Sequence, residues 1–228
     1  MKRILILALI FLMSACMLAI ILTTSISLVV YDDEFYYRQF DENLTVARSN
    51  VTSEGLRVIT DEIQTFLKGE KEEFSAVIEY EGQVQEVFSK QEKAHMKDVQ
   101  KLFSLARTLR LFSIIILAFV ILCLIKRNHK QCYKLFLCSA VISFLMVVIV
   151  SLLSVANFDS VFTALHRVLF SNELWLFEGS ENVLLNVLSG GFFTACAKQI
   201  LLWTMIIHIA LFFILGLIGR RINKPYKL

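Results

Sequence analysis

Four long stretches without a charged side chain restrict this sequence to one class of fold. They cover residues 4–30, 111–125, 135–155 and 200–219. Each reaches or approaches the roughly 20 residues that a helix needs to cross a bilayer. The composition agrees, because 57% of the 228 residues are hydrophobic, which is more than an ordinary soluble domain carries. The sequence therefore predicts an α-helical integral membrane protein with four transmembrane helices.

The second stretch is the shortest, but a helical pattern of apolar residues extends it toward the N-terminus. The pattern consists of Phe103, Ala106, Leu109 and Phe112. Arg107 and Arg110 lie on the same extension, where long basic side chains reach the polar surface of a bilayer. We therefore expect the second span to begin at residue 103.

Basic residues beside the spans are distributed unequally, which sets the orientation. The two terminal flanks and residues 126–134 together hold ten Lys and Arg and no Asp or Glu. Residues 31–102 hold 9 Lys and Arg against 16 Asp and Glu, a net charge of −7, and residues 156–199 hold 2 against 4, a net charge of −2. Because Lys and Arg beside spans stay in the cytoplasm, we expect both termini inside.

Together these features divide the chain into eight segments. The expected order is a cytoplasmic N-terminus with the first span (1–30), an extracytoplasmic domain (31–102), the second span (103–125), a cytoplasmic connection (126–134), the third span (135–155), an extracytoplasmic interfacial segment (156–199), the fourth span (200–219) and a cytoplasmic tail (220–228). One alternative for the N-terminus is a lipoprotein leader cleaved before Cys16. The charge-free residues 17–30 that follow this cysteine favour a span instead.

The extracytoplasmic domain has its own secondary-structure signals. A helix is predicted from Ser53, with apolar residues at helical spacing up to Leu67 and a closing Gly69. Two partly alternating runs, residues 76–80 and 83–88, surround Glu81-Gly82 and predict a β-hairpin. The domain contains no cysteine, so it cannot rest on disulfides. We expect a small α+β domain that leans on the spans or the lipid headgroups.

The second outer segment is too apolar for a solvated loop. It has six charges in 44 residues. Apolar residues share one helical face at Val161, Leu165, Val168 and Leu169, and Trp175 follows them. A helix with an apolar face and a nearby tryptophan is typical of the membrane interface. We therefore expect an interfacial helical segment between the third and fourth spans.

Histidines in both outer segments are the candidate functional residues. His95 and His166 are expected on the same face of the membrane and can exchange protons near neutral pH. The simpler interpretation is a solvated His95 and an interfacial His166 bonded to a backbone carbonyl. His208 lies within the fourth span and is interpreted as a neutral histidine that bridges helices. His129 lies in the basic cytoplasmic connection, close to lipid headgroups.

Metal chemistry is not expected. Two histidines and an acid are suitable zinc or iron ligands, but the sequence has no His-Glu-x-x-His, His-x-His or paired-cysteine element. We predict no metal and no cofactor.

The ordered motifs of this chain resemble the bacterial lipoprotein intramolecular transacylases, the Lit family. The resemblance rests on the four-span layout and on Phe88-Ser89-Lys90-Gln91-Glu92-Lys93-Ala94-His95-Met96-Lys97-Asp98-Val99 followed by Leu102-Phe103, then on His166 with Phe170, Asn172, Trp175 and Phe177, and on Phe192-Phe193. The chain departs from the family pattern at Gly179, where an acid-proline turn is usual, and at Ser189-Gly190-Gly191, where a leucine-proline element is usual. These departures leave both histidines in place.

The resemblance implies an acyltransferase in the bacterial cell membrane, with its active site on the extracytoplasmic face. Such an enzyme moves the sn-2 acyl chain of a diacylglyceryl lipoprotein to the α-amino group of its N-terminal cysteine and leaves a lyso-form lipoprotein. Its partners are lipoproteins in the outer leaflet and membrane lipid; no nucleic acid is expected.

Ester aminolysis needs two proton transfers, which suits two histidines. We expect His95 and His166 to act as the acid–base pair, with their individual roles undecided. Asp98, one helical turn after His95, is expected to orient the His95 ring and stabilise its imidazolium form, or to act only as an anion near a helix start. The resemblance also implies substrate contacts by Asn172, Trp175, Phe192 and Phe193.

Two alternatives from other classes stay open at this point. The first is a non-enzymatic sensor or partner-binding protein with an acidic outer domain, which would tolerate changes of the histidines. The second is an acyltransferase or lipase that acts on phospholipid, with Arg107 and Arg110 placed for a headgroup phosphate. Snorkelling at the interface is the simpler explanation of that arginine pair.

Overall fold

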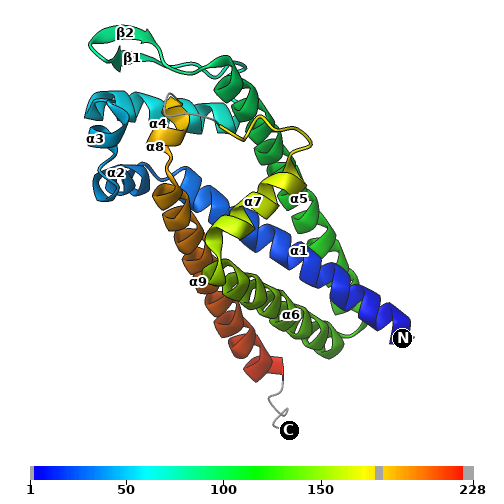
Figure 1. Cartoon of the computed structure of the whole chain (residues 1–228). Helices are drawn as coiled ribbons and strands as arrows, with labels where there is room; N and C mark the ends of the chain where they lie inside the picture. Colours follow the sequence, from blue (N-terminus) through cyan, green and yellow to red (C-terminus); the bar gives the residue numbers. More distant parts are fainter. Residues whose placement is uncertain (1–2, 178–181, 223–228) are drawn as a thin grey trace. The chain divides into compact units, whose positions relative to one another are not determined.

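The computed structural model describes residues 3–177 and 182–222 of the chain. Its elements, labelled in Figure 1, are α1 (Arg3–Val30), α2 (Asp33–Glu42), α3 (Thr45–Ser49), α4 (Ser53–Lys68), β1 (Val77–Tyr80), β2 (Gln83–Glu86), α5 (Lys90–Arg127), α6 (His129–Ala156), α7 (Phe158–Leu169), α8 (Val183–Val187) and α9 (Gly190–Ile222). Gly179, where the sequence departs from the family pattern, and the cations Lys2, Lys224 and Lys227 lie outside the described residues.

Four helices are long and apolar enough to cross a membrane, which confirms the predicted fold class. They are α1, α5, α6 and α9. The 38 residues of α5 correspond to about 57 Å of helix, well beyond the roughly 30 Å hydrocarbon layer. The predicted second span is therefore the C-terminal part of a longer helix that starts at Lys90, and His95 and Asp98 lie on its first turns rather than in a loop.

The chain divides into two compact units. We call Met1–Ile26, Arg107–Ala156 and Ile200–Leu228 the membrane unit, and Ser27–Ala106 with Asn157–Gln199 the site unit. In the membrane unit, Met13 of α1 packs with Val120 and Leu124 of α5 and with Leu135 of α6. Large apolar side chains elsewhere on these helices are exposed, as expected for helices whose solvent is lipid.

A polar contact between two helices of the membrane unit involves His208. Its Nδ1 donates to the carbonyl oxygen of Thr204 at 2.8 Å, and its Nε2 lies 3.2 Å from the Ser143 hydroxyl of α6. Since Nδ1 carries the proton, Nε2 accepts from Ser143. Both side chains are fully buried. These contacts agree with the interpretation of His208 as a histidine that bridges helices; its charge state stays a prediction.

The predicted elements of the first outer segment are present in the site unit. Helix α4 begins at Ser53, where the Thr52 hydroxyl caps the Gly55 amide at 3.1 Å, and ends before Gly69, whose φ of 83° is left-handed. Strands β1 and β2 pair antiparallel around Glu81 and Gly82, which both have positive φ. This geometry matches a tight hairpin turn. The small sheet between the first two spans is thus confirmed.

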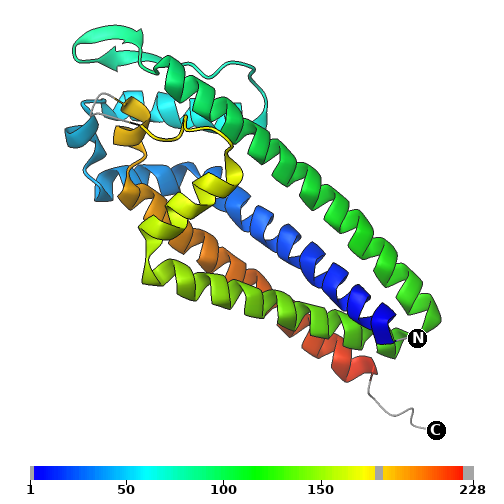
Figure 2. The same cartoon turned by 45° about the vertical axis from the view of Figure 1, so that its right-hand side comes forward.

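The second outer segment contributes α7 and α8 to the site unit. The helical face predicted for residues 161–169 lies on α7, and three of its four apolar side chains are exposed, Val168 at 82%, Leu165 at 52% and Leu169 at 50%. An exposed apolar face suits the headgroup region of a bilayer. Helix α8 is a short element that packs against α3, as Figure 2 shows.

Candidate active site

His95 lies on the second turn of α5, ahead of the apolar stretch of that helix. Its side chain is 8% exposed. The ring is packed edge-on against Phe170 and Phe177, with centroid distances of 5.2 and 5.5 Å. Aromatic rings from the second outer segment cover it, which argues against the simpler interpretation of His95 as a solvated residue.

His166 occupies the last turns of α7, on an aromatic wall. Its ring centroid is 4.1 Å from that of Phe162 and 5.0 Å from that of Trp175. The Nδ1 atom is 2.8 Å from the carbonyl oxygen of Phe162. A carbonyl only accepts, so Nδ1 carries the proton of the neutral ring and Nε2 is left as an acceptor. The expected bond to a backbone carbonyl is therefore present, and it fixes the tautomer.

The structure brings the two histidines together, although they are far apart in sequence. Their ring centroids are 6.4 Å apart and the ring planes are 27° from parallel. Phe170 contacts both rings, at 5.2 Å from His95 and 5.6 Å from His166. Two imidazoles at this separation can act on neighbouring atoms of one substrate.

Burial changes the acid–base behaviour of His95. Loss of solvent, and secondly the nearby His166, lower the pKa of His95 from its usual 6.5 to about 4, against the opposing charge of Asp98. His95 is therefore neutral near pH 7. Its Nδ1 atom is buried and has no hydrogen-bond partner among the described residues. A buried nitrogen of this kind is unusual in a folded protein, and one explanation is a functional role.

Asp98 does not orient the His95 ring by a direct bond, contrary to the expectation from their spacing. Its carboxylate accepts from Lys101 Nζ at 2.8 Å and from Asn172 Nδ2 at 2.9 Å. The bond from Lys101, followed by that from Asn172, lowers the pKa of Asp98. The carboxylate is thus ionised and acts on His95 only through space.

Asn172 organises the chain after α7. Its Nδ2 donates to Asp98, its Oδ1 accepts from the Leu174 amide at 3.1 Å, and its carbonyl accepts from Trp175 Nε1 at 3.0 Å. These bonds hold Trp175 against His166. The side-chain amide and the main-chain carbonyl of Asn172 thus already have partners within the protein. The expected substrate contact by this residue stays a prediction.

The two phenylalanines at the start of α9 have different surroundings. Phe192 is 3% exposed inside a cluster of Phe35, Tyr36 and Phe40. Its ring is core, and the expectation of a substrate contact is not supported at this position. Phe193 packs against Phe162 at 5.2 Å, so it supports the residue whose carbonyl binds His166.

Two residues of the first turn of α5 were not predicted as functional. Gln91 donates to the carbonyl oxygens of Leu174 and Leu176 at 3.2 and 3.0 Å. Glu92 accepts from the Ser89 amide at 2.7 Å, while the Ser89 hydroxyl accepts from the Glu92 amide at 3.2 Å. This reciprocal capping box is visible in the sequence as Ser-x-x-Glu. This pattern marks the start of α5 at Lys90, whereas the second span was predicted to begin at residue 103.

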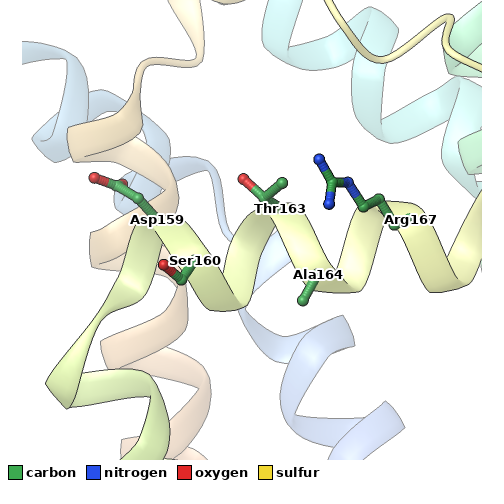
Figure 3. Close-up of a pocket in the computed structure, with 5 residues that line it drawn as sticks. All are labelled: Asp159, Ser160, Thr163, Ala164 and Arg167. Carbon is green, nitrogen blue, oxygen red and sulfur yellow. The ribbon is translucent and has the colours of Figure 1, made fainter.

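An open pocket of about 550 Å³ lies along α7. Asp159, Thr163 and Arg167 project from one side of the helix into it, as Figure 3 shows. Neither His95 nor His166 lines this pocket. The histidine pair, and not this pocket, therefore defines the candidate site.

The arrangement is suited to proton transfer next to an apolar substrate. One histidine is neutral and desolvated, the other has a fixed tautomer, and aromatic rings surround both. Within residues 3–177 and 182–222, no three side chains of His, Cys, Asp or Glu gather closely enough to hold a metal ion. The chemistry open to the described side chains is acid–base catalysis.

Comparisons with known proteins agree with this fold. Three solved structures of the lipoprotein intramolecular transacylase Lit from Bacillus cereus are similar in fold. The first shares 20% sequence identity with this chain and has a TM-score of 0.75. The match covers 96% of this chain and 100% of the Bacillus cereus chain. The other two are variants in which one histidine is replaced. The arginine variant has 19% identity and a TM-score of 0.74, and its match covers 96% of this chain and 95% of the variant chain. The alanine variant has 18% identity and a TM-score of 0.76, and its match covers 95% of this chain and 94% of the variant chain.

A search of curated protein sequences returned no match. The model of one protein family, described as lipoprotein intramolecular transacylase Lit, matches residues 11–193. The matched range contains both histidines and nearly the whole site unit. The resemblance noted in the sequence is therefore confirmed, and this multi-pass membrane protein belongs to the lipoprotein intramolecular transacylase family of acyltransferases.

Proposed function

We propose that this protein moves the sn-2 acyl chain of a diacylglyceryl lipoprotein to the α-amino group of the lipoprotein's own N-terminal cysteine. Family membership supplies the class of reaction and lipoprotein as the substrate. The observation that carries the proposal is the pair of imidazoles 6.4 Å apart, one of them buried with an unpartnered nitrogen. Membership of an acyltransferase family argues against the alternative of a non-enzymatic sensor.

The protons of the reaction can be assigned. The α-ammonium group, with a reference pKa of about 8, first releases one proton to solvent. The amine then attacks the ester carbon, loses a second proton, and the glyceryl oxygen gains that proton as its bond to carbon breaks. Because amine and ester belong to one molecule, correct orientation contributes about 7–11 kcal/mol to lowering the barrier.

The geometry favours different roles for the two histidines. His166 has Nε2 as acceptor, so it takes the proton from the attacking nitrogen and returns it to the leaving oxygen. His95 is neutral, with a pKa of about 4, and one of its ring nitrogens donates a hydrogen bond to the ester carbonyl oxygen as negative charge develops there. Asp98 and Asn172 hold Trp175 against His166 and so position the base.

We place both termini in the cytoplasm and the site on the extracytoplasmic face. The ten cations without acids beside the spans support this orientation. The exposed apolar face of α7 supports entry of the substrate from the outer leaflet. A cysteine introduced at the exposed Glu73, in a chain without its five natural cysteines, should react with an impermeant maleimide on intact cells.

Mass spectrometry of a reporter lipoprotein tests the proposed reaction. The reporter is expressed in a host that lacks transacylases, together with the natural chain, His95→Ala, His166→Ala or an empty vector. Fragment ions of the N-terminal lipopeptide locate each acyl chain. We expect an N-acyl, monoacylglyceryl cysteine only with the natural chain. A lipopeptide that stays diacylglyceryl even with the natural chain, at equal amounts of each variant in the membrane, would contradict the proposal.

A further inference from the structure

Glu92 is a buried acid that the reaction itself does not use. It lies on the first turn of α5, one turn before His95, and is 1% exposed. One carboxylate oxygen accepts from the Ser89 amide and the other from the Leu184 amide, each at 2.7 Å. A buried carboxylate with charge-assisted bonds to two amides is firmly held.

The bond to the Leu184 amide joins Glu92 to α8, a short helix that needs contacts with other parts of the chain to stay formed. Five residues are too few for a helix that persists alone in water. Glu92 binds an amide of its first turn, and Arg48 donates to the Asn186 carbonyl near its end through Nη2 at 2.8 Å and Nε at 3.2 Å. An anion at the start of a helix and a cation at its end both match the helix dipole.

Through α8, Glu92 is linked to the second histidine. Two residues separate α8 from α9, whose first turn carries Phe193. Phe193 packs on Phe162, and the carbonyl of Phe162 binds His166 Nδ1. The same turn of α5 carries Glu92 and leads directly to His95. One carboxylate thus joins the helix of His95 to the segment that supports His166.

We propose that Glu92 is a positioning residue that fixes the separation of His95 and His166 by holding α8 to the start of α5, with Arg48 holding the other end of α8. This inference rests on the proposed function for its catalytic consequence. Its geometric part, the placement of His166, is measurable without turnover.

The first test is Glu92→Gln. The side-chain amide keeps one acceptor oxygen, but its NH₂ group faces an N–H donor, so one of the two bonds is lost. Because a displacement of about 1 Å can cost about 100-fold in rate, we expect kcat to fall by about 10- to 100-fold with little change in KM. Arg48→Met, at an exposed position, should lower kcat in the same direction by a smaller factor.

Glu62→Gln is the matched control. Glu62 is also buried, at 4% exposure, accepts from the Ser75 amide at 3.0 Å and pairs with Lys71. It lies on α4, and its partners hold the chain before the hairpin. Glu62→Gln should cost a similar loss of thermal stability and leave kcat of the folded protein within about twofold of the natural value.

Trp175 fluorescence gives a readout that does not need activity. In a Trp203→Phe background it is the single tryptophan, and its emission reports its contact with the His166 ring. At one fixed pH, we expect the natural chain and Glu62→Gln to show the same quenching relative to a His166→Ala reference, and Glu92→Gln and Arg48→Met to show weaker quenching. Unchanged quenching in Glu92→Gln, or equal loss of kcat in Glu62→Gln, overturns the inference. A natural chain with the quenching but no transacylation would contradict the proposed function alone.

Discussion

Two buried histidines of this protein have opposite surroundings. His208 in the membrane unit has a partner at each ring nitrogen, the Thr204 carbonyl at 2.8 Å and the Ser143 hydroxyl at 3.2 Å. His95 in the site unit is buried beside a second histidine, and its Nδ1 has no partner among the described residues. Burial alone therefore does not separate a structural histidine from a functional one.

The distinction lies in satisfied and unsatisfied hydrogen-bonding capacity. An unpaired polar atom in a protein interior costs about 1–3 kcal/mol. A protein that carries this cost in the free state can recover it when a substrate supplies the missing partner. His208 has nothing left to offer a substrate, whereas His95 and the Nε2 atom of His166 do.

The largest expected effect comes from the pair in the site unit. His95→Gln and His166→Gln should each lower kcat/KM by about 10²–10⁴-fold, which is the usual contribution of one acid–base group. The double variant should be little worse than the poorer single variant, because residues that act as a unit are not additive. The lipopeptide products measured at matched protein levels provide the test. Strictly multiplicative losses would show that the two rings act independently.

A smaller loss is expected from the residue that holds Trp175. Asn172→Ala removes the bonds to Asp98 and to the Leu174 amide. We expect roughly a tenfold lower kcat, because the turn that carries Trp175 loses its side-chain bonds while the bond from Trp175 to the main-chain carbonyl of residue 172 remains. Initial rates with purified protein measure this change, and Asn172→Gln is the size control. A rate equal to that of the natural chain would remove Asn172 from the site.

The low pKa of His95 also predicts a pH-dependent stability. Its pKa is about 4 in the folded protein against 6.5 as the reference, so the unfolded chain binds more protons between these values. Stability should rise with pH from about 4 to 6.5 and lose up to about 3 kcal/mol on acidification. Thermal unfolding in detergent measures the effect. His95→Gln should lack this component, and an unchanged slope would assign it elsewhere.

The smallest effect is expected at the satisfied histidine. His208→Leu leaves the Ser143 hydroxyl without its partner and should destabilise the membrane unit by about 1 kcal/mol, a typical value for polar contacts between membrane helices. The transfer rate of the folded protein should stay within about twofold. A loss of turnover comparable with that of His95→Gln would break the contrast between the two regions.

Local patterns were sufficient to predict most of the fold. The charge-free stretches predicted the four spanning helices. The pattern from Ser53 to Gly69 predicted α4, and the runs around Glu81-Gly82 predicted the hairpin. Each of these features depends on residues close together in sequence. The capping box at Ser89 and Glu92 is also visible in the sequence. The predicted start of the second span at residue 103 rested instead on the apolar residues that begin at Phe103.

The sequence identified the two histidines of the candidate site but not their surroundings. The bonds from Leu184 to Glu92 and from Arg48 to Asn186 join residues 92 and 138 positions apart. No periodicity encodes such contacts, and the same is true of the rings that bury His95. The engagement of Asp98 with Asn172 instead of His95 likewise depends on the tertiary fold. The sequence therefore indicated the histidines, and the structure supplied the distinction between their environments.

A crossover experiment with purified protein in lipid vesicles tests both the intramolecular transfer and the role of His95. Two synthetic diacylglyceryl lipopeptides of different mass are mixed, and only one carries an isotope-labelled sn-2 chain. We predict that the natural chain and His208→Leu move the label to the cysteine nitrogen of the same peptide, and that His95→Gln does not. Label on the nitrogen of the other peptide, transfer from the sn-1 position, or natural rates in His95→Gln would contradict this prediction.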